Sequence, residues 1–303
     1  MNRERASGIA QSVQTRLGVK ADLEDRPYDE LLQLYGIERF LYRLAQSKHR
    51  DVLILKGALL LRVWLGENSR PTRDIDLLCP EDTDAARIRR ILRDIVETKV
   101  VGDGLEFEVD GIEVRPLRPD SPGLGLRAKF DGYIGRSRLR FQVDIGMGDR
   151  VVPEPEEVLF NGLLDLPIAP VKAYTVYTVV AEKLEAMAYL GNATSRMKDF
   201  YDLLILPRRL PFDGGALTAA IQATFNQRGS AIPDALAVLS GEGEWREQEA
   251  MWRAFLRKGR LSERASLAEA KLAIHAFLDL PAKAVVAGQP FDKFWVPGGS
   301  WQA

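Results

Sequence analysis

The chain has 303 residues, of which 46% are hydrophobic and 28% charged, an ordinary globular composition that excludes a fibrous or disordered chain. Its 42 basic and 43 acidic residues almost cancel, so the net charge does not indicate a nucleic-acid partner, although local arginine runs such as RIRR at 87–90 could contact phosphates. One cysteine and two histidines exclude an intramolecular disulfide and a Cys/His zinc set. Because no apolar run reaches about 18 residues, we expect a cytoplasmic protein without a membrane span.

The first part of the chain is expected to place helices around a sheet. Apolar residues spaced by three and four predict an amphipathic helix over 27–48. A short aliphatic strand at 51–55 follows, and Gly57 then leads into a buried helix, LLLRVWL. Residues 73–79 alternate as a strand does, and 82–97 form a second helix with an N-cap aspartate.

From 105 to 145 the pattern changes to strands in an antiparallel meander. Turns are expected at Asp110-Gly111 and Asp131-Gly132, because Asp-Gly favours tight hairpins. Together with the helices before it, this order of elements predicts a mixed sheet with helices packed on it.

The remainder is predicted to be mostly helical. A proline-marked connection sets a soft boundary near residue 165, and the tail from 287 is expected to be irregular. The expected helices cover 176–190, 196–206, 214–227, 245–257 and 264–280. We therefore expect an α+β chain with a sheet-containing core over 1–165 and a helical lobe over 166–303.

A pair of aspartates, Asp74 and Asp76, falls on one face of the predicted strand, because strand side chains alternate. Similar acid pairs elsewhere, such as Glu106 and Glu108, are expected to be solvated charge. Burying unpaired carboxylates costs several kcal/mol, so a strand that is otherwise apolar favours a cation as their partner. Asp144 ends a later strand and would join them if the two strands pair. Three carboxylates suit Mg²⁺ or Mn²⁺ and two-ion phosphoryl or nucleotidyl chemistry.

Five runs in this order, LKGALLLRVW, RPTRDIDLL, FQVDIGMGD, AEKLEAMAYLG and SRMKDFYDL, resemble the AbiEii/AbiGii (MenT-like) toxin family of minimal nucleotidyltransferases. The resemblance extends from about residue 50 to 206. It implies a polymerase-β-like nucleotidyltransferase core with a helical C-terminal lobe that completes the active site. It also implies a toxin of a type IV toxin–antitoxin or phage-defence system, with a cognate antitoxin. Such a toxin transfers a nucleotide from a nucleoside triphosphate (NTP) to an acceptor hydroxyl and releases pyrophosphate; the tRNA 3′ end is the favoured acceptor and a protein side chain stays open.

The resemblance also implies the roles of particular residues. Expected catalytic residues are Asp74, Asp76, Asp144, Lys183 and Asp199, and the first three are the expected metal ligands. Expected nucleotide-binding residues are Lys56, Gly57, Ala58, Arg73, Lys183, Arg196, Lys198 and Asp202. Lys183 would face the triphosphate as a point charge.

Plainer interpretations of these positions stay open. Lys183 would otherwise be an exposed lysine paired with Glu182 or Glu185, and Lys56 a strand-end lysine in solvent. Lys198 and Asp202 are four residues apart, the spacing of a helix salt bridge.

At one position the chain departs from the family pattern, because its Gly-Ser turn is Gly57-Ala58 here. Alanine removes the hydroxyl that commonly touches the triphosphate, while backbone N–H groups at a helix start can still bind phosphate. A decayed fold that acts as a binding module through a partner protein therefore stays an alternative. A haloacid-dehalogenase-type phosphatase is disfavoured, since Thr72-Arg73 rather than an apolar strand precedes the first aspartate.

Overall fold

The computed structural model describes residues 3–66, 69–117, 125–191, 195–240 and 246–303. The chain forms two compact units. Unit 1 comprises Met1–Glu67, Thr72–Asp149 and Glu156–Ala173, and unit 2 comprises Asn68–Pro71, Arg150–Pro155 and Tyr174–Ala303. The expected boundary was a single position near residue 165. The observed division differs, because two short segments before that position, 68–71 and 150–155, belong to unit 2.

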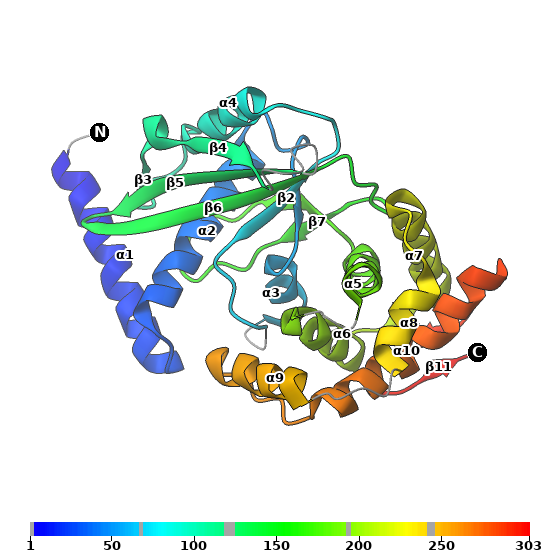
Figure 1. Ribbon diagram of the computed structural model, residues 1–303. Helices are drawn as coiled ribbons and strands as arrows, with labels where there is room; N and C mark the ends of the chain where they lie inside the picture. Colours follow the sequence, from blue (N-terminus) through cyan, green and yellow to red (C-terminus); the bar gives the residue numbers. More distant parts are fainter. Residues whose placement is uncertain (1–2, 67–68, 118–124, 192–194, 241–245) are drawn as a thin grey trace. The chain divides into compact units, whose positions relative to one another are not determined.

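Within the described residues, unit 1 is built on an eight-stranded sheet with the order β3-β5-β6-β2-β1-β8-β7 and with β4 paired to β5 (Figure 1). Strand β2 runs parallel to β6, whereas β1 and β2 run antiparallel, so the predicted mixed sheet is confirmed. The strands are β1 (Ile54–Lys56), β2 (Ile75–Cys79), β3 (Leu105–Phe107), β4 (Glu113–Pro116), β5 (Leu126–Ile134), β6 (Ser137–Met147), β7 (Glu156–Leu159) and β8 (Pro170–Ala173).

Helices pack on this sheet through large apolar side chains. Phe40 of α2 lies 5.9 Å from Phe130 and 6.4 Å from Phe141, measured between ring centroids. The unit 1 helices are α1 (Arg3–Glu24), α2 (Tyr28–Gln46), α3 (Leu59–Leu65) and α4 (Ala85–Val96). The last three confirm the predicted helices. Asp84 caps α4 by accepting a hydrogen bond from the backbone N–H of Arg87, whereas α1 was not predicted.

Strand β5 corrects one predicted turn. Asp131-Gly132 lies inside β5, and the chain turns instead at Gly135 and Arg136. A Cβ atom at Gly132 would lie 3.0 Å from Phe141, so this glycine makes room for aromatic packing in a strand and not for a turn. Both β3 and β4 pair with β5, so the order is not a simple meander. The turn at Asp110-Gly111 is confirmed as part of a short 3₁₀ segment.

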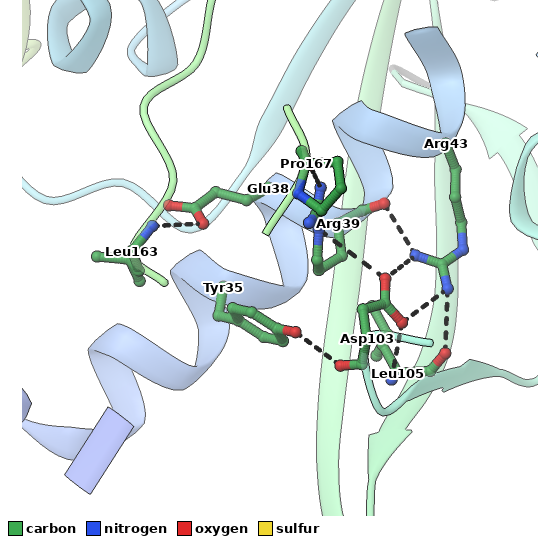
Figure 2. Close-up of polar contacts among 8 residues, drawn as sticks. All are labelled: Tyr35, Glu38, Arg39, Arg43, Asp103, Leu105, Leu163 and Pro167. Carbon is green, nitrogen blue, oxygen red and sulfur yellow. Dashed lines mark hydrogen bonds and ion pairs between the residues drawn. The ribbon is translucent and has the colours of Figure 1, made fainter. Parts of the chain in front are cut away.

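Buried charges tie α2 to the rest of unit 1 (Figure 2). The guanidinium of Arg43 donates to both carboxylate oxygens of Asp103, at 2.6 and 3.0 Å, and to the carbonyl of Leu105. Glu38 accepts a 2.9 Å hydrogen bond from the N–H of Leu163 through one oxygen. Burial raises the pKa of Glu38 to about 7, because a carboxylate loses its hydration there. The contacts between Arg43 and Asp103 offset part of the cost of burying both charges.

Unit 2 is mostly helical, as predicted, and has a small sheet. Its helices are α5 (Val176–Leu190), α6 (Met197–Arg209), α7 (Gly214–Arg228), α8 (Ile232–Ser240), α9 (Arg246–Lys258) and α10 (Leu267–Ala287). Five of them match the predicted helices and α8 was not predicted. The tail is not irregular: β10 (Phe294–Trp295) pairs with both β9 (Phe212–Asp213) and β11 (Trp301–Gln302). No helix among the described residues combines the length and the apolarity that a membrane crossing requires.

Candidate active site

Four charged residues lie in one row across the sheet of unit 1. In the strand register Lys56 of β1 is opposite Asp76 of β2, Asp76 is opposite Asp144 of β6, and Asp144 is opposite Arg127 of β5. Directly opposed residues on neighbouring strands point to the same face of a sheet. The row therefore presents two carboxylates between two cations on one face. The strand of Asp144 pairs with that of Asp76, which is the condition under which Asp144 was expected to join the two aspartates.

Asp74 lies beside this row. Strand β2 begins at Ile75 and is shorter than the predicted 73–79, so Asp74 just precedes it. The amide nitrogen Nε2 of Gln142, two residues before Asp144 in β6, donates to Oδ1 of Asp74 at 3.2 Å. Asp74 is exposed, whereas Asp76 and Asp144 are half-buried. All three carboxylates therefore belong to one region of the sheet.

Arg127 holds Asp144 with both ends of its guanidinium. Its Nε and Nη2 atoms donate to the two carboxylate oxygens at 2.7 Å each, the two-pronged geometry in which arginine binds carboxylates most strongly. The hydrogen bond with Asp144 raises the pKa of Arg127, and the charges of Asp74 and Asp76 add to the rise. Sequence reasoning missed Arg127. The alternation of Arg127 and Lys129 with apolar residues along β5 did indicate that both side chains lie on one face of the strand.

The three carboxylates fit Mg²⁺ or Mn²⁺ by chemistry, because both ions prefer hard oxygen donors. Their side chains do not converge, however: in the part of the chain that the structure describes, no three His, Cys, Asp or Glu side chains are grouped so that they could hold an ion. Arg127 engages both oxygens of Asp144. A metal bound by all three carboxylates would therefore share Asp144 with this guanidinium or replace it.

The turn before α3 is shaped around Asp76. Gly57 has a φ of +75°, and a Cβ atom built there would lie 2.1 Å from Oδ2 of Asp76. Only glycine fits, since its α-carbon rests against that carboxylate. The next residue, Ala58, starts α3 without a side-chain cap.

Lys56 is not a solvent lysine. Its side chain is 17% exposed, and its ammonium nitrogen Nζ lies 3.1 Å from Oδ2 of Asp149, a residue that sequence reasoning missed. The interpretation of Lys56 as a strand-end lysine in solvent is therefore wrong. Arg73, another expected nucleotide contact, is exposed.

Unit 2 contains a second charged cluster around Lys183 of α5. Its ammonium lies 2.7 Å from an oxygen of Asp199 and 2.7 Å from an oxygen of Asp202, both on α6. Lys183 is 13% exposed, and the two aspartate side chains are 3% and 0% exposed. The alternative of an exposed lysine paired with Glu182 or Glu185 is therefore wrong.

Arginines complete this cluster. The guanidinium of Arg70 donates to both oxygens of Asp202, at 2.8 and 2.9 Å, and Nε of Arg196 lies 2.7 Å from Asp199. Arg70 was missed because it lies 132 positions away from its partner. Lys198 is exposed and does not form the proposed helix salt bridge, since Asp202 is engaged by Lys183 and Arg70.

The cluster shifts the titration of its members. Burial alone would lower the pKa of Lys183, but Asp202 and Asp199 outweigh it and the pKa is raised. Burial would raise the pKa of Asp202, but Lys183 and Arg70 outweigh it and the pKa is lowered. Lys183 and Asp202 therefore both stay charged near neutral pH.

Comparison with known proteins identifies the family of the chain. Residues 39–279 match the sequence model of the nucleotidyl transferase AbiEii toxin family of type IV toxin–antitoxin systems. The chain belongs to this family. AbiEii membership makes it a nucleotidyltransferase toxin, and it implies an NTP substrate and an antitoxin partner.

A solved structure, that of MenT4, is similar to this chain in fold. MenT4, a nucleotidyltransferase toxin from Mycobacterium tuberculosis H37Rv, is 17% identical with a TM-score of 0.53, and the match covers 92% of this chain and 99% of MenT4. A putative nucleotidyltransferase from H. pylori is 13% identical, with a TM-score of 0.47 and coverage of 87% and 99%. JHP933 from Helicobacter pylori is 14% identical, with a TM-score of 0.47 and coverage of 86% and 94%. No curated protein matches the chain.

Proposed function

We propose that this AbiEii-family toxin uses Mg²⁺ or Mn²⁺ to transfer a nucleotide from an NTP to the 3′ hydroxyl of an RNA, with tRNA as the acceptor. The row of Lys56, Asp76, Asp144 and Arg127 supports the proposal most directly, because it gathers carboxylates and cations on one face of the sheet. Asp74, Asp76 and Asp144 would hold the ions, with Asp144 serving the ion at the acceptor. Bound ions lower the pKa of an attacking hydroxyl and stabilise charge on a leaving pyrophosphate.

In the transfer, the acceptor oxygen loses its proton to solvent and forms a bond with the α-phosphorus. The bond from that phosphorus to the oxygen bridging the α- and β-phosphates breaks, and pyrophosphate leaves with the electron pair. Lys56 is placed by its register opposite Asp76 to bind phosphate oxygens. Gly57 lets the carboxylate of Asp76 rest against the chain, which fixes its position.

Lys183 would contribute positive charge to the bound triphosphate. An ammonium has three N–H donors, and the contacts with Asp199 and Asp202 use two of them. In this proposal the third donates to a phosphate oxygen. Asp199 and Asp202 are then positioning residues, since they orient the ammonium and keep it charged.

The RNA acceptor rests on family resemblance, as does a role in phage defence. The proposal is tested by incubating the folded protein with each α-³²P-labelled NTP, Mg²⁺ and total tRNA. We expect label on RNA, lost about a thousandfold in Asp76→Asn, and unchanged in Glu106→Gln, a matched exposed acid on β3. Label on protein alone would contradict the RNA acceptor, and no label with any NTP would contradict transfer.

A binding module with a decayed site is the second candidate, and Ala58 is the observation that favours it. Ala58 starts α3 with no side-chain hydrogen bond, so the triphosphate loses one hydroxyl contact of the family pattern. Calorimetric titration separates the two functions. A decayed module binds neither Mg²⁺ nor NTP, whereas the proposed enzyme binds both and gains NTP affinity in Ala58→Ser.

A further inference from the structure

An arginine-rich cavity in unit 2 is separate from the Lys183 cluster. It has a volume of about 410 Å³, is open to solvent, and is lined by α9 from Glu249 onward, the loop to α10 and the first turn of α10. Four arginines and three glutamates are among its eleven lining residues. The arginines, called here the arginine patch, are Arg253, Arg257, Arg260 and Arg264. All four are exposed.

The three glutamates of the cavity are engaged by the chain itself. Glu249 accepts hydrogen bonds from Arg253 and from the N–H of Leu267. Glu263 accepts from the backbone N–H groups of the two following residues and from Arg208. Glu269 forms a capping box with Ser266. Their negative charge is therefore used to hold the loop and the start of α10.

Three cations of the patch are left without such partners. Within the described residues, the side chains of Arg257, Arg260 and Arg264 have no hydrogen-bond or ion-pair partner. Clustered guanidinium groups repel one another, and the charge of Glu269, which accepts hydrogen bonds from Ser266, offsets part of that repulsion. A ligand with several negative charges would reduce the repulsion that remains.

The loop that presents these arginines is held firmly. The indole nitrogen of the fully buried Trp252 donates to the carbonyl of Ala265 at 2.8 Å. The N–H of Leu261 bonds to the carbonyl of Leu256, and Arg260 adopts a positive φ of 50° between them. A loop fixed in this way loses little further entropy on binding, which favours a preformed site.

The patch is also fixed to α6, the helix that carries Asp199 and Asp202, the two aspartates that contact Lys183. Tyr201 of α6 lies between Asp199 and Asp202 in sequence and packs on Phe255 and Trp252 of α9, with ring centroids 5.8 and 6.4 Å apart. Arg208 of α6 bonds to Glu263 of the loop. A ligand held at the patch is therefore held at a constant distance from the cluster.

We infer that the arginine patch binds the phosphodiester backbone of the acceptor RNA, an inference that rests on the proposed function. Guanidinium groups match phosphate oxygens in charge and in their forked geometry. An acidic protein segment fits less well, because protein interfaces need exposed apolar or aromatic anchors and the two leucines of the cavity are buried or half-buried. The arginines would contact only phosphates, so the patch positions RNA without selecting its sequence.

The test compares two triple variants of the full chain in RNA-binding titrations over a range of NaCl concentrations. The patch variant is Arg257→Gln, Arg260→Gln and Arg264→Gln. The control, Arg16→Gln, Lys99→Gln and Lys293→Gln, removes the same charge from exposed positions outside the patch. A 3′-labelled RNA hairpin, ATP and polyglutamate are the probes.

We expect the patch variant to bind RNA at least about tenfold more weakly at 0.15 M NaCl. Its plot of log affinity against log salt should be shallower by about two, since each lost contact removes about 0.7 of slope. The control should match the unmodified protein, and ATP affinity should be unchanged in both.

Three results would overturn the inference: equal RNA binding by the patch variant and the control, a loss of ATP affinity, or a loss confined to polyglutamate. If the unmodified protein labels RNA and the patch variant binds it normally, only this inference fails. If the unmodified protein neither binds nor labels RNA, the proposed acceptor fails with it.

Discussion

Arg127 and Asp144 meet through two hydrogen bonds of 2.7 Å, one to each carboxylate oxygen. Asp144 is also the neighbour of Asp76 in the strand register. One carboxylate is thus shared between a guanidinium and the position where a divalent ion would be held. The two cations compete for it, because the guanidinium already neutralises its charge and occupies one lone pair on each oxygen.

Arg127→Gln should lower the Mg²⁺ concentration that gives half-maximal transfer, by about fivefold, because a partly exposed ion pair contributes about 1 kcal/mol. The measurement is transfer rate against Mg²⁺ concentration. Lys129→Gln is the matched control, as Lys129 lies two residues further on the same face of β5 and is exposed. A higher Mg²⁺ requirement in Arg127→Gln would show that the arginine supports the site.

Gly57→Ala should abolish transfer, while Gly66→Ala should not. Both glycines have a positive φ, of 75° and 61°, so both substitutions strain the backbone. Only at Gly57 would the new Cβ collide with Asp76, 2.1 Å from its Oδ2 and 2.8 Å from its own Cβ. Nothing lies within 4 Å at Gly66.

Transfer rates and melting temperatures of the two glycine variants test whether activity depends on the position of Asp76. Comparable activity in both, at comparable stability, would mean that the position of Asp76 is not critical. Loss of transfer in both variants would mean that backbone strain, and not the displaced carboxylate of Asp76, causes the loss.

Periodicity was enough to predict β6, but Asp144 does not end it, because the strand continues to Met147. The partner of Asp144 was not predicted either. That partner depends on the register of β5 against β6, and a turn at Asp131-Gly132 would have shortened β5 by four residues. The real turn, four residues later, brings Arg127 opposite Asp144. Arg70 gave no signal at all, because an ion pair with Asp202 across 132 positions leaves no local pattern. The resemblance supplied the remaining candidates around Lys183, which no spacing rule connects.

Asp202→Asn should destabilise the protein by about 3 to 5 kcal/mol, because it leaves Lys183 and Arg70 short of a buried counter-charge. The folded-state pKa of Asp202 is lowered from 3.8. Its stabilisation is therefore present above pH 3.8 and is lost as the pH falls through the lower folded value. The difference between the two proteins should accordingly shrink in acid.

Urea unfolding of the Asp202→Asn variant and the unmodified protein between pH 3 and pH 8 measures this difference. Lys198→Gln is the control on the same helix, and it should change stability by less than about 0.5 kcal/mol, because Lys198 is exposed. A pH-independent difference would mean that the charge of Asp202 is not what stabilises the cluster.

Glu38→Gln should stabilise the protein above pH 7 and have little effect near pH 4.5. Burial raises the folded-state pKa of Glu38 from 4.5 to about 7, although the backbone N–H of Leu163 and the charges of Arg62, Arg39 and Lys20 oppose the rise. The folded state therefore binds more protons than the unfolded state between these two pH values. The free energy of unfolding then falls as the pH rises through this window and is constant above it.

A shift of this size corresponds to about 3 kcal/mol. Glutamine keeps an oxygen that can accept the hydrogen bond from Leu163 and carries no charge, so Glu38→Gln should remove the decline between pH 4.5 and 7. Asp29→Asn is the control, since Asp29 is an exposed acid in the first turn of the same helix. Urea unfolding across this range measures the slopes. Parallel slopes for Glu38→Gln and the unmodified protein would mean that Glu38 stays ionised inside unit 1, with its charge balanced by the surrounding cations.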